Sequence, residues 1–210
     1  MLIFGRLSRI IIVIGVISTA VLTERARADA IDDEVRAAYS TTTTTICFEQ
    51  EALMPEMWEF TFRENYPGAP EETIRIYRFF CNSGAYNVSH VYFSYTELYG
   101  VQPVAFAIPA YDVECVGPET LDCDVAGVTL TGMTTQIGLV NSTFDPDTLE
   151  LTALSCWRGL CDASERGLWI LEHGVFVLKS FDVDASYNER EDPIRVVDYA
   201  PAAAEPPGKR

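Results

Sequence analysis

Lysine and histidine are almost absent from this 210-residue chain, which carries Lys179 and Lys209, and His90 and His173. The sequence holds 15 basic and 31 acidic residues, which gives a formal net charge of −16. A surface this acidic repels nucleic acid and anionic lipid headgroups. We therefore exclude a nucleic-acid partner and expect an unknown protein or a small ligand.

The sequence also lacks the short motifs of common enzyme classes. It has no Gly-x-Ser-x-Gly elbow, His-Glu-x-x-His helix, phosphate-binding loop or dinucleotide-binding fingerprint. A nucleophilic Ser or Cys needs a nearby base, and the two histidines are poor candidates. We interpret His90 as a half-buried structural residue and His173 as a solvated residue at a hairpin tip. No cofactor is expected, and the abundant carboxylates leave carboxylate-based hydrolysis open.

No apolar run matches the roughly 20 residues of a membrane-spanning helix. Ile10–Leu22 is shorter, follows Arg6 and Arg9, and precedes Ala26-Arg27-Ala28. Basic residues, an apolar stretch and then a small-x-small triplet are typical of a secretory signal peptide, with cleavage after Ala28. The sequence therefore predicts a periplasmic or secreted protein. A retained leader, which would be its one membrane contact, is the alternative.

All six cysteines follow this leader, and an even number in an exported chain indicates disulfides. Six cysteines allow 15 pairings, among which the sequence cannot choose. Loop closure favours near neighbours, hence Cys115–Cys123 and Cys156–Cys161, which leaves Cys47–Cys81 with a stabilisation of roughly 3.8 kcal/mol. A zinc site is not expected, because no CxxC or His-x-His accompanies these cysteines.

Three segments are expected in the chain. Residues 1–28 form the signal peptide, 29–199 an exported domain, and 200–210 a disordered Ala/Pro-rich tail. The first 28 residues contain four of the basic residues and one of the acidic ones, so the remaining chain has a net charge of −19. The domain is long enough for a sizeable apolar core.

Hydrophobic residues alternate with a period of two, which predicts half-buried strands. Trp58, Phe60 and Phe62 show this pattern, and His173-Gly174 suits a tight hairpin. Turn signals recur every 8–12 residues or so, which favours a mainly β fold of antiparallel sheets, sandwich or barrel-like. The domain can divide near Gly117-Pro118 into two similar β-rich halves. Further strands are expected at Ile74–Cys81, Val88–Tyr95, Val128–Thr131, Thr135–Val140, Leu149–Leu154, Leu168–Glu172, Val175–Phe181 and Ile194–Tyr199.

The start of the exported domain is less regular. Asp29–Tyr39 predicts one amphipathic helix. The β-branched run Thr41–Thr45 predicts either a flexible stem or the start of a strand that continues into Ile46-Cys47-Phe48.

Several short sequence motifs occur in the same order as in an exported bacterial family, domain of unknown function 1176, which the chain therefore resembles. They are Cys81–Asn87, Gly100-x-x-Pro103 with Phe106, Phe144–Leu149, Arg158–Asp162, and Trp169 with Phe176-x-Leu178. The resemblance covers about 81–181 and implies an exported β-rich protein without an assigned reaction. In the family pattern the cysteine follows the aspartate, whereas here Cys161 precedes Asp162. The later cysteine of the family has no counterpart after Lys179, so we expect Cys156 as the partner of Cys161.

Two segments are candidates for a site. The first consists of two short motifs that we expect to share a surface, one with Tyr86 and Asn87 and the other with Arg158. Arg158 either binds an anionic group of a ligand or, as we favour, pairs with Asp162. Oxygen-bearing side chains also alternate at Asp182, Asp184, Ser186 and Asn188, as in calcium loops. Tyr187 stands where such a loop needs glycine, so a polar connection between strands is the favoured interpretation.

The sequence thus favours a non-catalytic exported protein that binds a partner or is associated with the cell envelope. The alternative is a carboxylate-based hydrolase of the envelope.

Overall fold

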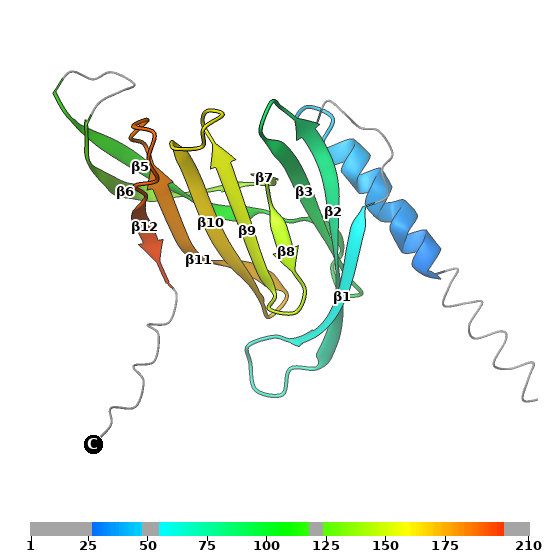
Figure 1. Ribbon diagram of the computed structural model, residues 1–210. Coiled ribbons are helices and arrows are strands. Elements are labelled where there is room, and N and C mark those ends of the chain that lie inside the picture. Colours follow the sequence, from blue (N-terminus) through cyan, green and yellow to red (C-terminus); the bar gives the residue numbers. More distant parts are fainter. Residues whose placement is uncertain (1–26, 48–54, 118–123, 200–210) are drawn as a thin grey trace, which may run out of the picture.

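The computed structural model describes residues 27–47, 55–117 and 124–199, which form a mainly β structure of antiparallel strands (Figure 1). The described strands form open sheets rather than a closed barrel. They are β1 (Glu56–Arg63), β2 (Glu71–Ser83), β3 (Val88–Thr96), β4 (Gly100–Pro103), β5 (Phe106–Val116), β6 (Asp124–Gln136), β7 (Gly138–Val140), β8 (Thr143–Asp145), β9 (Glu150–Cys156), β10 (Ser164–Glu172), β11 (Val175–Asp184) and β12 (Ile194–Asp198).

The strands are arranged in two five-stranded sheets and one ribbon. The first sheet has the order β1-β2-β3-β4, with β7 also paired to β3, and the second has the order β12-β11-β10-β9-β8. The third unit is the two-stranded β5–β6 ribbon, which runs behind the second sheet and projects past it at the left of Figure 1.

One core spans both sides of Gly117. Ile76 and Tyr92 of the first sheet pack in the same cluster as Leu151 and Trp169 of the second. β7 also crosses over, because it follows the ribbon in the chain but pairs with β3. The two sides of Gly117-Pro118 therefore share their apolar interior.

Trp169 connects the second sheet to the ribbon. Its side chain is 1% exposed, and its indole Nε1 donates to the Ala107 carbonyl on β5 at 3.1 Å. The ring packs edge-on against Phe106, with 5.7 Å between centroids. Gly167 and Trp169 lie two residues apart on β10 and therefore share one face of the sheet, and a Cβ atom on Gly167 would lie 2.1 Å from a carbon of the indole ring.

The predicted helix is confirmed, and it covers residues 27–42 of the described chain. Ile31, Val35 and Tyr39 on one face are buried against the outer side of the first sheet. The Tyr77 hydroxyl donates to Asp32 at 2.9 Å, and burial together with that carboxylate raises the pKa of Tyr77 to about 12. The Cys47–Cys81 disulfide links Cys47, which follows the helix, to β2.

The prediction of a strand start at Thr41–Thr45 is wrong. Thr41 continues the helix, and its hydroxyl donates to the Ala37 carbonyl at 2.8 Å. Thr43 is buried and donates to the Tyr39 carbonyl at 2.7 Å. Side-chain bonds to the preceding turn thus overrule the β preference of threonine.

The hairpin at His173-Gly174 is confirmed, since it joins β10 to β11. Gly174 has φ +81°, and a Cβ atom there would lie 2.8 Å from the Phe62 ring. The boundaries around β6 differ from the prediction. One strand runs through Gly132-Met133, and the predicted strand Thr135–Val140 is divided between the end of β6 and β7.

Two disulfides are confirmed, Cys47–Cys81 and Cys156–Cys161. Cys115 is also disulfide-bonded, whereas Cys123, its predicted partner, lies outside the described residues. The predicted leader lies mostly outside them, and so does the predicted tail at 200–210.

We predict that Gly167→Ala lowers the free energy of unfolding by about 1–3 kcal/mol, because the new methyl group displaces the Trp169 indole from a packed core. Urea denaturation followed by tryptophan fluorescence measures this. Gly132→Ala is the matched control in a strand, because its Cβ atom would meet nothing within 4 Å. Equal stability of the two variants would contradict the packing role of Gly167.

Candidate functional site

The two motifs expected to share a surface, one around Tyr86 and the other around Arg158, are in contact in the structure. The Tyr86 hydroxyl donates to the Trp157 carbonyl at 3.2 Å, and a Cβ atom on Gly159 would touch the Tyr86 ring at 3.6 Å. The β2–β3 turn of one sheet thus contacts the β9–β10 loop of the other, at the upper end of Figure 1.

The side chain of Asn87 connects the first sheet to the second by hydrogen bonds. Its amide Nδ2 donates to the Cys156 carbonyl at 2.8 Å, and its Oδ1 accepts from Asn141 Nδ2 at 3.0 Å. Asn141 Nδ2 also donates to the Leu154 carbonyl at 3.0 Å. The Asn87 side chain, predicted as a ligand contact, is therefore used to hold this end of the molecule together.

Asn141 is the residue of this cluster that sequence reasoning missed. Its φ of 44° is left-handed, a conformation that asparagine tolerates better than most residues. Its Oδ1 accepts from the Val88 amide at 2.8 Å. An asparagine directly after a short apolar strand was the available signal, but nothing in the sequence showed that it faces the β2–β3 turn.

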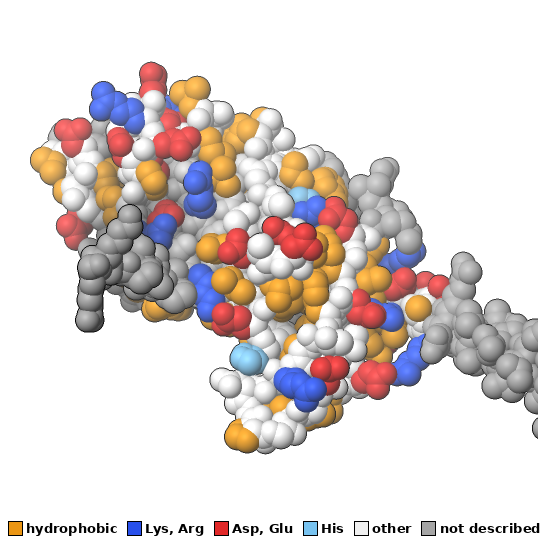
Figure 2. All heavy atoms as spheres, turned by 60° about the horizontal axis from the view of Figure 1, so that its bottom comes forward, with side chains coloured by type: hydrophobic (Ala, Val, Ile, Leu, Met, Phe, Trp, Pro, Cys, Tyr) orange, Lys and Arg blue, Asp and Glu red, His pale blue; other side chains and the backbone are white. Residues whose placement is uncertain are grey.

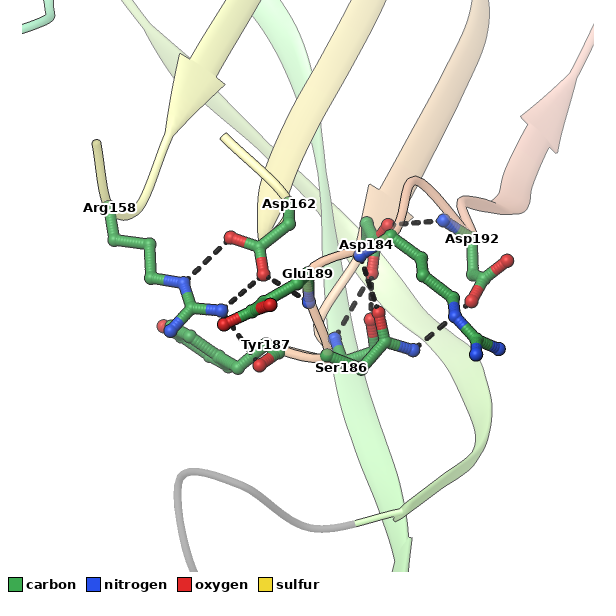
Figure 3. Close-up of polar contacts among 9 residues, drawn as sticks. Arg158, Asp162, Asp184, Ser186, Tyr187, Glu189 and Asp192 are labelled. Atoms are coloured by element: carbon green, nitrogen blue, oxygen red, sulfur yellow. Dashed lines mark hydrogen bonds and ion pairs between the residues drawn. The ribbon is translucent and has the colours of Figure 1, made fainter. Parts of the chain in front are cut away.

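Arg158 forms the ion pair that the sequence favoured. Its Nε donates to Asp162 Oδ1 at 2.6 Å, and Nη2 donates to Asp162 Oδ2 and to the Tyr187 carbonyl (Figure 3). Its guanidinium carbon lies 5.4 Å from the centroid of the Tyr187 ring. These contacts tie the β9–β10 loop, which is closed by Cys156–Cys161, to the loop after β11.

Asp162 is buried at the centre of this ion pair, with 4% of its surface exposed. Its Oδ2 also accepts from the Glu189 amide at 2.7 Å. The Arg158 hydrogen bonds, assisted by that amide, hold the pKa of the Asp162 carboxyl well below its usual range. Asp162 is thus a fixed anion, which is the opposite of what a general acid requires.

The calcium-like residues are used by the loop itself. Asp184 Oδ1 accepts from the Ser186 amide and hydroxyl, and its Oδ2 accepts from the Asp192 amide at 2.6 Å. Asp182 instead pairs with Arg195 of β12, and Asn188 Nδ2 donates to Asp192 at 3.1 Å. Asp184, Ser186 and Asn188 line an open cavity of about 340 Å³, whereas Asp182 does not.

This arrangement fits a polar connection between β11 and β12. Among the described residues, no group of three or more His, Cys, Asp or Glu side chains is placed to hold a metal ion.

The two histidines occupy different surroundings. His90 lies on β3, and its Nδ1 is 3.3 Å from the hydroxyl of Ser142, which accepts from Tyr92 at 2.9 Å. Burial and the nearby Arg78 lower the pKa of His90. Ser142 is 4% exposed, and its hydroxyl lies between the buried Tyr92 and the half-buried His90. His173 is exposed, with Nδ1 2.6 Å from the Arg63 carbonyl.

The basic side chains of the described residues lie largely beside acidic ones. Figure 2 shows this on one face, where acidic groups also surround hydrophobic ones. Six arginines and Lys179 are in ion pairs, and the arginines are Arg27, Arg63, Arg75, Arg78, Arg158 and Arg195.

Comparisons of the chain with protein-family models, with curated proteins and with solved structures gave no match. The resemblance to domain of unknown function 1176 therefore stays a prediction. In the part of the chain that the structure describes, no helix is long and apolar enough to cross a membrane.

We predict that Asp162 makes the protein sensitive to acid. Because its folded-state pKa lies below the ordinary 3.8, its ion pair stabilises the fold above about pH 4, and this stabilisation is lost as the pH falls further. Urea midpoints of the wild type and of Asp162→Asn should therefore differ clearly near pH 7 and converge towards pH 2. A difference that stays constant with pH would show that the carboxylate charge is not responsible.

Proposed function

We propose that this protein is an exported, non-catalytic binding protein, periplasmic or secreted, that engages a partner protein through one end of its two sheets. We define the loop-end surface as Tyr86, Trp157, Leu160 and Tyr187, which come from the β2–β3 turn, the β9–β10 loop and the loop after β11.

The disulfides support export. The cysteines of the described residues are all in disulfides, and such bonds persist in oxidising compartments such as the periplasm. The leader-like sequence gives the same indication. Cleavage after Ala28 is compatible with the fold, because the buried face of the helix begins at Ile31. It would remove one exposed ion pair, Arg27–Glu97, and such pairs contribute little to stability.

The observation that carries the binding proposal is the exposure of Tyr86 and Leu160 on a rigid backbone. Leu160 is 66% exposed and Tyr86 46%. Leu160 lies in the short loop that the Cys156–Cys161 disulfide closes. Tyr86 follows β2, which the Cys47–Cys81 disulfide links to the segment after the helix. Side chains carried on a constrained backbone lose less entropy on binding. Tyrosine is among the residues that commonly dominate interface energies, and Leu160 adds apolar surface that a partner can bury.

The buried carboxylates give the hydrolase alternative no support. Among the described residues, Asp162 and Asp184 are the buried acids. Both accept backbone amides of the segment between β11 and β12. A hydrolase of this type needs two carboxyl groups that face a substrate, whereas these two organise a loop.

We expect the chain recovered from its native compartment to begin at Asp29. N-terminal sequencing of that material measures this directly, with material from the cytosol of an expression host as the comparison. A start at Met1 in the native compartment would refute leader removal and favour the retained anchor.

We predict that Leu160→Ser reduces partner capture from envelope extract at least about tenfold, because it removes the apolar surface that Leu160 would bury against the partner. Quantitative mass spectrometry of cross-linked complexes measures the loss. Leu98→Ser is the matched control, since Leu98 is 64% exposed in the turn between β3 and β4, at the opposite end of β3.

The control should capture as much as the wild type. Equal capture by Leu160→Ser and Leu98→Ser would refute the loop-end surface as the binding site. Tyr86→Phe keeps the ring and loses its hydroxyl, so it should retain capture if the ring is the contact. Capture that disappears with small-molecule extract as competitor would identify a ligand and overturn the choice of a protein partner.

A further inference from the structure

We propose that β6 is an acceptor edge, which pairs by main-chain hydrogen bonds with an extended, lysine- or arginine-bearing segment of a partner protein. This surface is separate from the loop-end surface, and the proposal does not depend on it. We call residues 127–136 of β6 the open edge.

The open edge is long and carries neither a charged residue nor a proline, unlike the other edges of the described sheets. Natural edge strands are shortened, charged or interrupted by proline, because unpaired N–H and C=O groups invite another strand. β1 carries Glu56, Glu59 and Arg63, and β12 carries Arg195 and Asp198. The edge strands β4, β7 and β8 have only three or four residues, and β5 contains Pro109.

β6 is different in length and in charge. It has 13 residues, and after Asp124 none of them is charged. Within the described residues, β5 is the one strand that pairs with β6. Most of the open edge is exposed, including Leu130 at 41% and Met133 at 47%.

Among the described residues, the position of the ribbon leaves this edge accessible. β5 lies against β11, and β6 lies against β12, which is the last strand of the second sheet. The outer side of β6 therefore faces away from the sheet, and Figure 1 shows the ribbon extending beyond it.

Two register shifts divide β6 without closing its edge. The strand has one extra residue opposite Ala110/Tyr111 and another opposite Glu114/Cys115. Between and beyond them, residues 127–130 and 132–136 keep regular antiparallel pairing with β5. Each stretch is long enough for a short peptide strand, and neither suits a long continuous sheet.

Charge determines which occupant fits. Asp112, Glu114 and Asp124 are exposed on the ribbon, and its described residues include no basic side chain. Glu114 accepts from the Thr129 hydroxyl at 2.9 Å, so its carboxylate lies beside the open edge. A strand added next to β6 could direct lysine or arginine side chains across it to these carboxylates, as in peptide recognition by strand addition.

A second copy of this chain fits less well. It would bring the same three carboxylates and the same strongly negative net charge to the contact. The favoured occupant is therefore a cationic extended segment.

The test uses a capped ten-residue peptide in which lysine alternates with valine and threonine, titrated into the folded protein by fluorescence anisotropy. Two control peptides separate the contributions. One has alternate peptide nitrogens methylated, which blocks strand pairing, and the other has glutamate in place of lysine. We expect binding of the lysine peptide that weakens with salt, and at least about tenfold weaker binding of both controls.

Protein variants locate the site. Leu130→Lys should weaken binding about tenfold, because it places a positive charge on the open edge, and Leu98→Lys is its exposed control away from the ribbon. Glu114→Gln should weaken binding several-fold without affecting the fold. Hydrogen exchange should show slower β6 amides in the complex.

Equal affinity for the methylated peptide, or no effect of Leu130→Lys, would refute strand addition at β6. Concentration-dependent dimers in sedimentation that Leu130→Lys abolishes would instead identify a second copy as the occupant and overturn the cationic segment. Loss of peptide binding leaves the loop-end experiment unaffected, so the two proposals fail separately.

Discussion

The packing of Trp169 over Gly167 is the contact on which the arrangement of the sheets depends. The indole belongs to the second sheet, bonds to the backbone of β5, and packs against Phe106 and Phe181. It thereby fixes the ribbon across the second sheet, and the ribbon leads into β7, which joins the first sheet. A smaller residue than glycine does not exist, so position 167 has no alternative that leaves room for the ring.

The sequence predicts the local elements better than their assembly. Alternation of apolar residues is a property of each strand alone, and it located β1 to β3 and β9 to β11 well. β5 was not predicted, because its Pro109 and its acidic outer half obscure the pattern. Thr41 extended the helix and Thr43 capped its end through side-chain bonds to the preceding turn, which no propensity scale includes.

In the candidate site too, the sequence predicts local contacts better than contacts between distant segments. The pairing of Arg158 with Asp162 follows from their separation of four residues in a short loop, and the structure confirms it. The meeting of Tyr86 with Gly159 was expected only as a shared surface, and Asn141 was not expected at all. Contacts between residues more than 50 positions apart depend on sheet topology, which hydrophobic periodicity does not encode.

Each described disulfide joins a cysteine to the next cysteine along the chain. A polypeptide that enters an oxidising space from its N-terminus presents its thiols in this same order. Joining each thiol to the one that emerges after it gives the native Cys47–Cys81 bond first, and the native Cys156–Cys161 bond last. For a chain that is exported as proposed, correct pairing of these four cysteines then needs no rearrangement of earlier bonds.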